Sequence, residues 1–137
     1  MTRYLFLTAF AVIALLSPLA HAAPATSYGT LVSAHIFSFG GVGITGKRTP
    51  EENSYDTLMR RPDREQQLRS LLAEARTPAG KLYALHGLRA LRVRDYWDLA
   101  MPYRRDHERV DTAFACIVGR ADVAEMVRYA DNAYAVK

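Results

Sequence analysis

The amino-acid sequence predicts a mainly α fold, a compact bundle of about five short helices in one domain. Two observations carry this prediction. Thr49-Pro50 and Thr77-Pro78 each combine a helix N-cap residue with proline at the first helical position. Leucines then recur at helical spacing over residues 68–91, as on the buried face of a packed helix. A short strand stays open as an alternative beside the glycine-rich loop and over residues 110–118.

Residues 1–22 have the pattern of an export signal. Arg3 gives a positive start, residues 4–16 are uncharged and mostly apolar, Pro18 breaks the helix, and small residues precede a cleavage site after Ala22. The alternative is an uncleaved anchor, but the apolar run is shorter than the about 20 residues of a spanning helix. We expect a periplasmic or secreted protein without a stable membrane span after cleavage.

The rest of the chain divides into a short linker and one domain. Residues 23–30 are small and polar, and we expect a flexible linker there. Residues 31–137 are predicted to form a single helical domain. One cysteine excludes an internal disulfide. The chain has 18 basic residues, of which Arg3 would be removed to leave 17, against 14 acidic ones.

The first predicted elements surround a glycine-rich loop. Leu31 to Phe39 is apolar and suits a short strand or an N-terminal helix. Glycines at positions 40, 41, 43 and 46 then form a loop in which glycine supplies positive φ angles. Thr49 opens a capping box with Glu52, which predicts a helix to about Arg61.

Three further helices are expected between residues 62 and 102. The first runs from Pro62-Asp63 to Arg76, the second from Thr77 to about Leu91, and the third over 93–101, where Pro102 ends or kinks it. Gly87 lies inside the second of these helices. Because glycine costs about 1 kcal/mol there relative to alanine, we expect another backbone to pack closely against it.

The spacing of apolar residues changes in the C-terminal part of the chain. Alternate residues over 110–118 are apolar, as in a strand, although a helix suits the segment nearly as well. Gly119 is expected to stop this element, and residues 121–129 return to helical spacing, with a frayed tail from Asp131. The successive helical hairpins suggest a HEAT- or armadillo-like arrangement or an orthogonal bundle.

The glycine loop resembles two phosphate-binding motifs in its spacing. Gly41 to Gly46 matches G-x-G-x-x-G, and Lys47 follows as in a P-loop, but Arg48 stands where that motif needs Ser or Thr. Both motifs also need a helix directly after the loop. An exported protein meets no nucleotide pool. We therefore expect a structural turn, with no nucleotide and no cofactor.

A small hydrolase site is the main catalytic alternative. His107, Glu108 and Asp111 resemble the start of a zinc-protease helix, but the second histidine is missing, so we expect no metal and a solvated loop instead. Cys116 lies among apolar neighbours, which favours a buried structural thiol over a nucleophile.

An aromatic group with neighbouring arginines is the best candidate for a binding surface. Tyrosine, tryptophan and arginine are the residues that most often anchor protein interfaces. The alternative is that Tyr96 and Trp97 fill the core between two helices. The predicted binding residues are Tyr83, Arg94, Tyr96, Trp97, Tyr103 and Arg104. Acidic residues are interleaved with the arginines throughout the chain, so nucleic-acid binding is not expected.

Three segments resemble those of small exported bacterial proteins of an uncharacterised family: Phe39 to Gly43, Thr77 to Leu85, and Cys116-Ile117. The resemblance implies no catalytic residue. In size, export signal and helical content the chain is also similar to periplasmic immunity proteins that neutralise secreted cell-wall amidases. We expect an exported, non-enzymatic protein-binding module, with a cell-envelope hydrolase and a structural envelope protein as alternatives.

Overall fold

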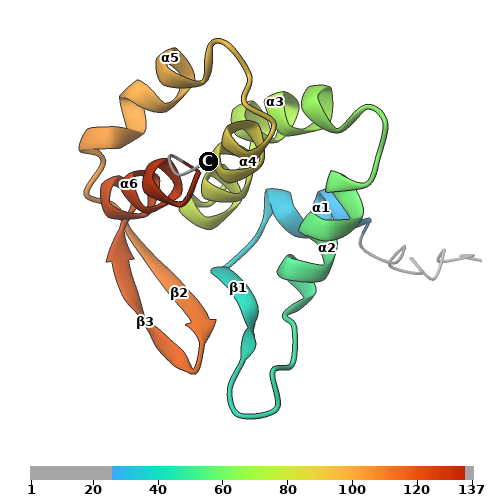
Figure 1. The fold of residues 1–137 in the computed structure, drawn as a ribbon, viewed down its shortest axis with the longest axis vertical. Coiled ribbons are helices and arrows are strands. Elements are labelled where there is room, and N and C mark those ends of the chain that lie inside the picture. Colours follow the sequence, from blue (N-terminus) through green and yellow to red (C-terminus); the bar gives the residue numbers. More distant parts are fainter. Residues whose placement is uncertain (1–25, 135–137) are drawn as a thin grey trace, which may run out of the picture.

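The computed structural model describes residues 26–134, and the predicted export signal at 1–22 lies outside them. Most helices lie together at one end of the molecule, and a small sheet extends away from them (Figure 1). The elements in chain order are α1 (Ser27–Val32), β1 (Ile36–Val42), α2 (Pro50–Met59), α3 (Arg64–Glu74), α4 (Pro78–Ala90), α5 (Tyr96–Ala100), the 3₁₀ helix η1 (Met101–Arg105), β2 (Arg109–Ala115), β3 (Ile117–Asp122) and α6 (Val123–Ala133).

The sheet makes this an α/β protein, so the predicted mainly α bundle is wrong. Its strand order is β1-β2-β3, with β1 parallel to β2 and β2 antiparallel to β3. Phe37 lies opposite Thr112 and Phe39 opposite Phe114. The strands that meet here are about 70 residues apart in the chain. Local sequence patterns do not report such a pairing, because its hydrogen bonds form only after the intervening helices have folded back.

Both predicted helix caps are confirmed. The Thr49 side chain accepts a hydrogen bond from the Glu52 backbone N–H, and the Thr77 side chain accepts one from the Gly80 N–H. Proline at the first position follows each cap, where its missing N–H has no cost. The 93–101 prediction was too long, since α5 covers only Tyr96–Ala100 and Pro102 lies inside η1.

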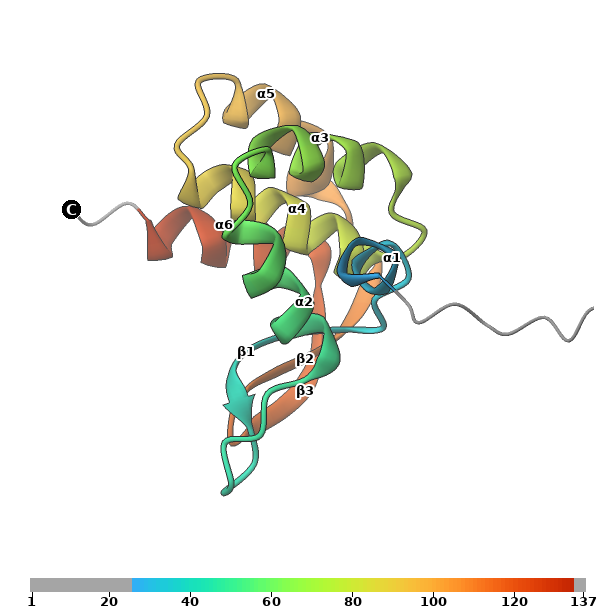
Figure 2. The same ribbon diagram turned by 90° about the vertical axis from the view of Figure 1, so that its right-hand side faces the viewer.

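Helix α4 is the centre of the molecule and contacts α3, α5, α6 and β1 (Figure 2). Leu82, Leu85 and Leu88 are all buried. At Gly87 an added Cβ would lie 2.6 Å from a methyl carbon of Leu68, so its close neighbour is a side chain and not the predicted backbone. The close backbone approach is at Gly80, where a Cβ would lie 2.5 Å from the Leu31 carbonyl oxygen.

The C-terminal segment is a β-hairpin followed by a helix. Gly119 pairs with Thr112 inside β3 and does not end the element, contrary to the prediction. The chain turns at Ala115, whose φ is 52°, and Cys116 is exposed beside this turn instead of buried. Its apolar neighbours do not cover it, because the hairpin tip extends beyond the helices.

The N-terminal boundary also differs from the prediction. Residues 27–30 of the expected linker are helical, because α1 begins at Ser27 with Thr26 as its N-cap. Leu31 at the end of this helix is fully buried, which anchors the segment to the core. Across residues 26–134, no helix combines the length and apolar character needed to cross a membrane.

Candidate functional site

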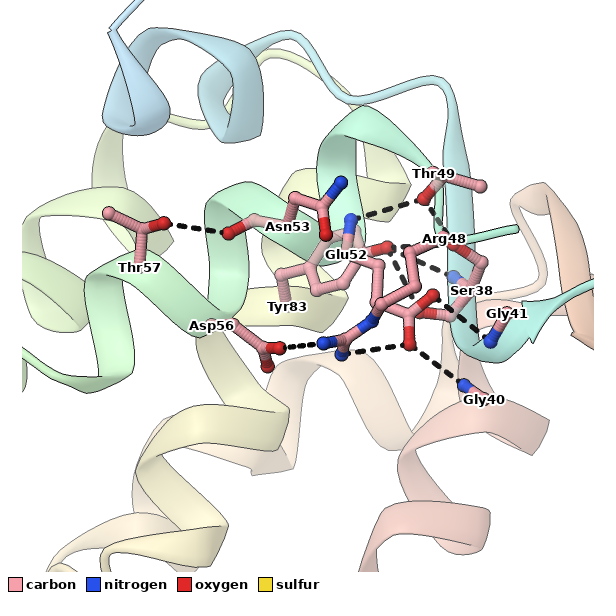
Figure 3. Close-up of polar contacts among 10 residues, drawn as sticks. All are labelled: Ser38, Gly40, Gly41, Arg48, Thr49, Glu52, Asn53, Asp56, Thr57 and Tyr83. Atoms are coloured by element: carbon pink, nitrogen blue, oxygen red, sulfur yellow. Dashed lines mark hydrogen bonds and ion pairs between the residues drawn. The ribbon is translucent and has the colours of Figure 1, made fainter. Parts of the chain in front are cut away.

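The predicted glycine-rich loop at residues 40–46 begins inside β1, where Gly40 and Gly41 lie at a bulge of the strand. The backbone amides of these two glycines bind a carboxylate of the protein itself. Glu52, 1% exposed, accepts hydrogen bonds from the backbone N–H groups of Gly40 at 2.9 Å and Gly41 at 3.2 Å (Figure 3). The Arg48 guanidinium donates to the same carboxylate at 3.0 Å. Within the predicted phosphate motif, this side chain therefore occupies the amide of Gly41, and the amides of Val42, Gly43 and Gly46 donate to backbone carbonyl groups. In the predicted capping box Glu52 should reach back to the cap residue, but it contacts the loop instead.

Hydroxyl groups extend this arrangement from the loop to α4. The Ser38 backbone N–H donates to the Tyr83 hydroxyl at 3.0 Å, and that hydroxyl donates to the Ser38 carbonyl at 3.2 Å. The Ser38 and Thr49 hydroxyls lie 2.7 Å apart. Arg48 also pairs with Asp56. We call these residues the Glu52 cluster: Ser38, Gly40, Gly41, Arg48, Thr49, Glu52, Asp56 and Tyr83 (Figure 3).

Tyr83 therefore lies apart from the surface on which it was predicted. Its side chain is fully buried and joins α4 to the edge of β1. A buried hydroxyl with its partners inside the protein offers nothing to a ligand. Tyr83 is a structural part of the Glu52 cluster.

The structure does not bring the hydrolase candidates together. His107 is solvent-exposed and lies 3.2 Å from Asp122, while Asp111 pairs with Arg120 at 2.7 Å. A cavity of about 120 Å³ is lined by Asp111 and Arg120 but not by His107 or Glu108. Within residues 26–134 no group of three His, Cys, Asp or Glu side chains could hold a metal ion.

Three of the remaining candidates, Tyr96, Trp97 and Arg104, gather where α5 and η1 lie next to α6. Tyr96 is 1% exposed, and its hydroxyl donates to Asp131 at 2.8 Å. Arg104 donates to the other oxygen of Asp131 at 2.5 Å. Burial, and then the bond to Asp131, raises the pKa of the Tyr96 hydroxyl well above 10, so this group stays a donor.

Trp97 packs against this hydrogen-bonded group and is about half exposed, at 47%. The guanidinium of Arg104 lies over the indole at 4.6 Å from the ring centroid, and that of Arg89 lies at 5.1 Å. Met101 is 62% exposed and follows Trp97 by one helical turn, its backbone N–H donating to the Trp97 carbonyl, so it extends the apolar surface. Cation–π contacts of this kind hold an exposed ring in one orientation. We call this group the Trp97 surface: Arg89, Tyr96, Trp97, Met101, Arg104 and Asp131.

Tyr103 and Arg94 lie near this surface but outside it. Tyr103 lines a groove of about 320 Å³ between α3 and α5 together with Leu72, Leu99 and Pro102. Arg94 is exposed just before α5. The start of α5 is fixed by Asp95, which binds Arg69 through two hydrogen bonds.

Sequence reasoning missed three members of the Trp97 surface. Arg89 lies in the last turn of α4, Met101 starts η1, and Asp131 was expected in a frayed tail but is buried in α6. The high hydrophobic periodicity of residues 123–131 was the one signal that placed Asp131 in an ordered helix.

The Trp97 surface suits binding better than catalysis. It presents an aromatic ring, a thioether and two guanidinium groups, and its one carboxylate, Asp131, is occupied by Tyr96 and Arg104. Such a set recognises shape and charge but offers no free base or nucleophile. No protein-family model, no curated protein and no solved structure matches the chain.

Proposed function

We propose that this protein is an exported, non-enzymatic binding module that docks another protein through the Trp97 surface. The observation that carries the proposal is the half-exposed indole of Trp97 held by Arg89 and Arg104. A large apolar ring costs free energy when it stays in water. Here Tyr96 packs against the ring and the two guanidinium groups cover it in part, but 47% of Trp97 stays exposed.

The support around Trp97 is what a binding anchor requires. Interface hot spots are enriched in Trp, Tyr and Arg, and a pre-ordered side chain loses little entropy on binding. Tyr96 contacts the indole edge-on, with ring centroids 5.3 Å apart, and its own hydroxyl is fixed by Asp131. The ring is therefore oriented before any partner arrives.

Export from the cytoplasm would place this surface in the periplasm or the medium. An immunity or inhibitor role is the more specific form of the proposal, in which the partner is a secreted toxin or enzyme. The hydrolase alternative is weaker, because His107 and Asp111 face different ion-pair partners.

Crosslinking and affinity capture from the exported fraction of the producing cells test the docking proposal. We expect a partner that is captured by the wild type and lost with Trp97→Ala. Ile44→Ala is the matched control, because Ile44 is a fully exposed apolar residue on the glycine loop. Equal capture by both variants, or loss with both, would contradict docking through the Trp97 surface.

A further inference from the structure

Arg89 lies over two aromatic rings and has no carboxylate partner among residues 26–134. Its guanidinium lies 5.3 Å from the Tyr96 ring centroid and 5.1 Å from that of Trp97. Its Nε is buried and has no hydrogen-bond acceptor. No ion pair within 4.0 Å is present for it among residues 26–134, whereas Arg104 pairs with Asp131 and Arg69 with Asp95. A partly buried cation without an anion is costly and uncommon.

We propose that Arg89 receives a carboxylate from the partner protein, supplied by an acidic side chain next to an apolar residue that packs on Trp97 and Met101. The inference rests on the proposed docking function and adds the chemistry of the partner. The carboxylate would pair with the outer Nη atoms of the Arg89 guanidinium, because the Nε is buried and out of reach of another protein. Guanidinium–carboxylate bonds are often bidentate and are stronger than neutral hydrogen bonds.

The surrounding charge favours an acidic partner. Residues 89–105 contain five arginines and two aspartates. Asp95 is neutralised by Arg69, so the unpaired charge near Trp97 is mainly positive. Complementary charge steers a partner toward its site and disfavours basic proteins.

A protein carboxylate suits the site better than a nucleic acid. Phosphate backbones are bound by many cations along a track, while here Arg104 is already occupied and Asp98 directly follows Trp97. The site has one unpaired guanidinium beside an apolar ring. That combination matches a short acidic and apolar segment of a protein.

Trp97 is the chain's single tryptophan, so its fluorescence reports on this surface alone. The probe is a hexapeptide with leucine and phenylalanine at its centre and two glutamates on each side. Its matched control replaces the four glutamates with glutamines. We expect the acidic peptide to change the Trp97 emission at a concentration at least about 10-fold lower than the amide peptide.

Two variants of equal net charge locate the effect. Arg89→Gln should weaken binding of the acidic peptide at least about 10-fold, while Arg64→Gln, an exposed arginine at the start of α3, should change it less than about 2-fold. In the wild-type protein, the NMR signal of the Arg89 Nε–H should shift with the acidic peptide only, which tests the site without any substitution. An equal loss in both variants would overturn the carboxylate site in favour of general charge attraction.

Other outcomes separate this inference from the docking function. Equal binding of both peptides, with no Arg89 Nε–H shift, would overturn the carboxylate site and leave docking on Trp97 intact. If neither the Trp97 emission nor the Arg89 Nε–H signal changes with either peptide, the carboxylate site is overturned. Docking would still be supported if the wild type, but not Trp97→Ala, captures a partner. Tighter binding of a single-stranded oligonucleotide than of the acidic peptide would replace the partner class with nucleic acid.

Discussion

The Glu52 cluster and the Trp97 surface contain the same kinds of side chain but differ in whether every charged group has a partner. Each combines arginine, a carboxylate and aromatic rings. In the Glu52 cluster the buried carboxylate accepts from two backbone amides and from Arg48. At the Trp97 surface Asp131 satisfies Tyr96 and Arg104, and Arg89 is left over. The Glu52 cluster has balanced partners and holds the fold together. The Trp97 surface has an unpaired cation and a half-exposed ring, which is why we propose that it binds a partner.

Helix α4 connects the two regions. Tyr83, His86 and Arg89 follow one another at three-residue intervals along one side of the helix, which is the spacing of neighbouring turns. Tyr83 belongs to the Glu52 cluster and Arg89 to the Trp97 surface. Between them, His86 lies among aromatic rings of Phe37, Phe39 and Tyr55. We therefore expect substitutions at the Tyr83 end of α4 to reduce stability and substitutions at the Arg89 end to affect the proposed binding.

The largest effect is expected from Glu52→Ala, which opens the closed cluster. The change leaves the Gly40 and Gly41 N–H groups and the Arg48 guanidinium without their carboxylate. We expect the free energy of unfolding to fall by roughly 3–5 kcal/mol, as for other buried pairs that lose one partner. Urea denaturation measures this loss, with Glu51→Ala as the control on the same helical turn. A loss below that of the control would show that the cluster is not structural.

Acidification should destabilise the middle of α4. Burial lowers the pKa of His86 from 6.5 to about 4, and Tyr134 contacts one ring nitrogen while the other has no partner. The unfolded state binds the proton more readily than the folded state. The contribution of neutral His86 to the free energy of unfolding is therefore complete above pH 6.5, and it falls by roughly 3 kcal/mol as the pH drops toward 4.

Chemical denaturation from pH 7 to pH 4 measures this dependence. His86→Phe should remove that part of the slope, while exposed carboxylates contribute equally to both proteins. If the two proteins lost stability in parallel, the buried His86 would not be its source.

A smaller effect separates two glycines of the same loop. Gly41 has φ 73°, and a Cβ there would overlap the carbonyl group of Gly46, whereas Gly43 has the same φ with open space around it. We expect Gly41→Ala to cost roughly 2–3 kcal/mol from clash and strain and Gly43→Ala about 1 kcal/mol from strain alone. Thermal unfolding of both variants gives the comparison. Equal costs would mean that the loop backbone shifts freely.

The smallest effect, with the opposite sign, is expected at the open surface. Arg89→Met replaces the unpaired cation with an apolar side chain of similar length. We expect the free energy of unfolding to stay unchanged or to rise by up to about 1 kcal/mol, because no partner is left without its charge. Urea denaturation checks the sign. A loss comparable to that of Glu52→Ala would mean that Arg89 is structural and that the two regions do not differ in kind.

Local signals predicted the helix starts well and the Trp97 surface in part. Thr49 and Thr77 form their caps within a few residues, so their bonds depend little on the rest of the fold. Trp97 and Arg104 were recognised from composition, and the structure places both at one surface. Tyr83 was grouped with them because it lies close in sequence, but α4 directs it to the opposite cluster.

Contacts between distant segments decided three other features. These are the sheet, the exposure of Cys116, and the binding of the Glu52 carboxylate by the glycine amides. β1 pairs with a strand about 70 residues away, and Cys116 is exposed because the hairpin extends past the helices. Apolar neighbours in sequence predict burial only when another element covers them. Nothing does so at the hairpin tip among the described residues.

The sequence by itself determined where α2 and α4 begin and that the glycines at positions 40, 41, 43 and 46 adopt positive φ, since these are properties of neighbouring residues. Only the tertiary structure decided which charges are paired. Glu52 meets the loop, Asp131 meets Arg104, and Arg89 meets rings alone, because each of these outcomes depends on which elements pack side by side. The difference between the structural Glu52 cluster and the proposed binding surface at Trp97 was therefore fixed by packing and not by residue type.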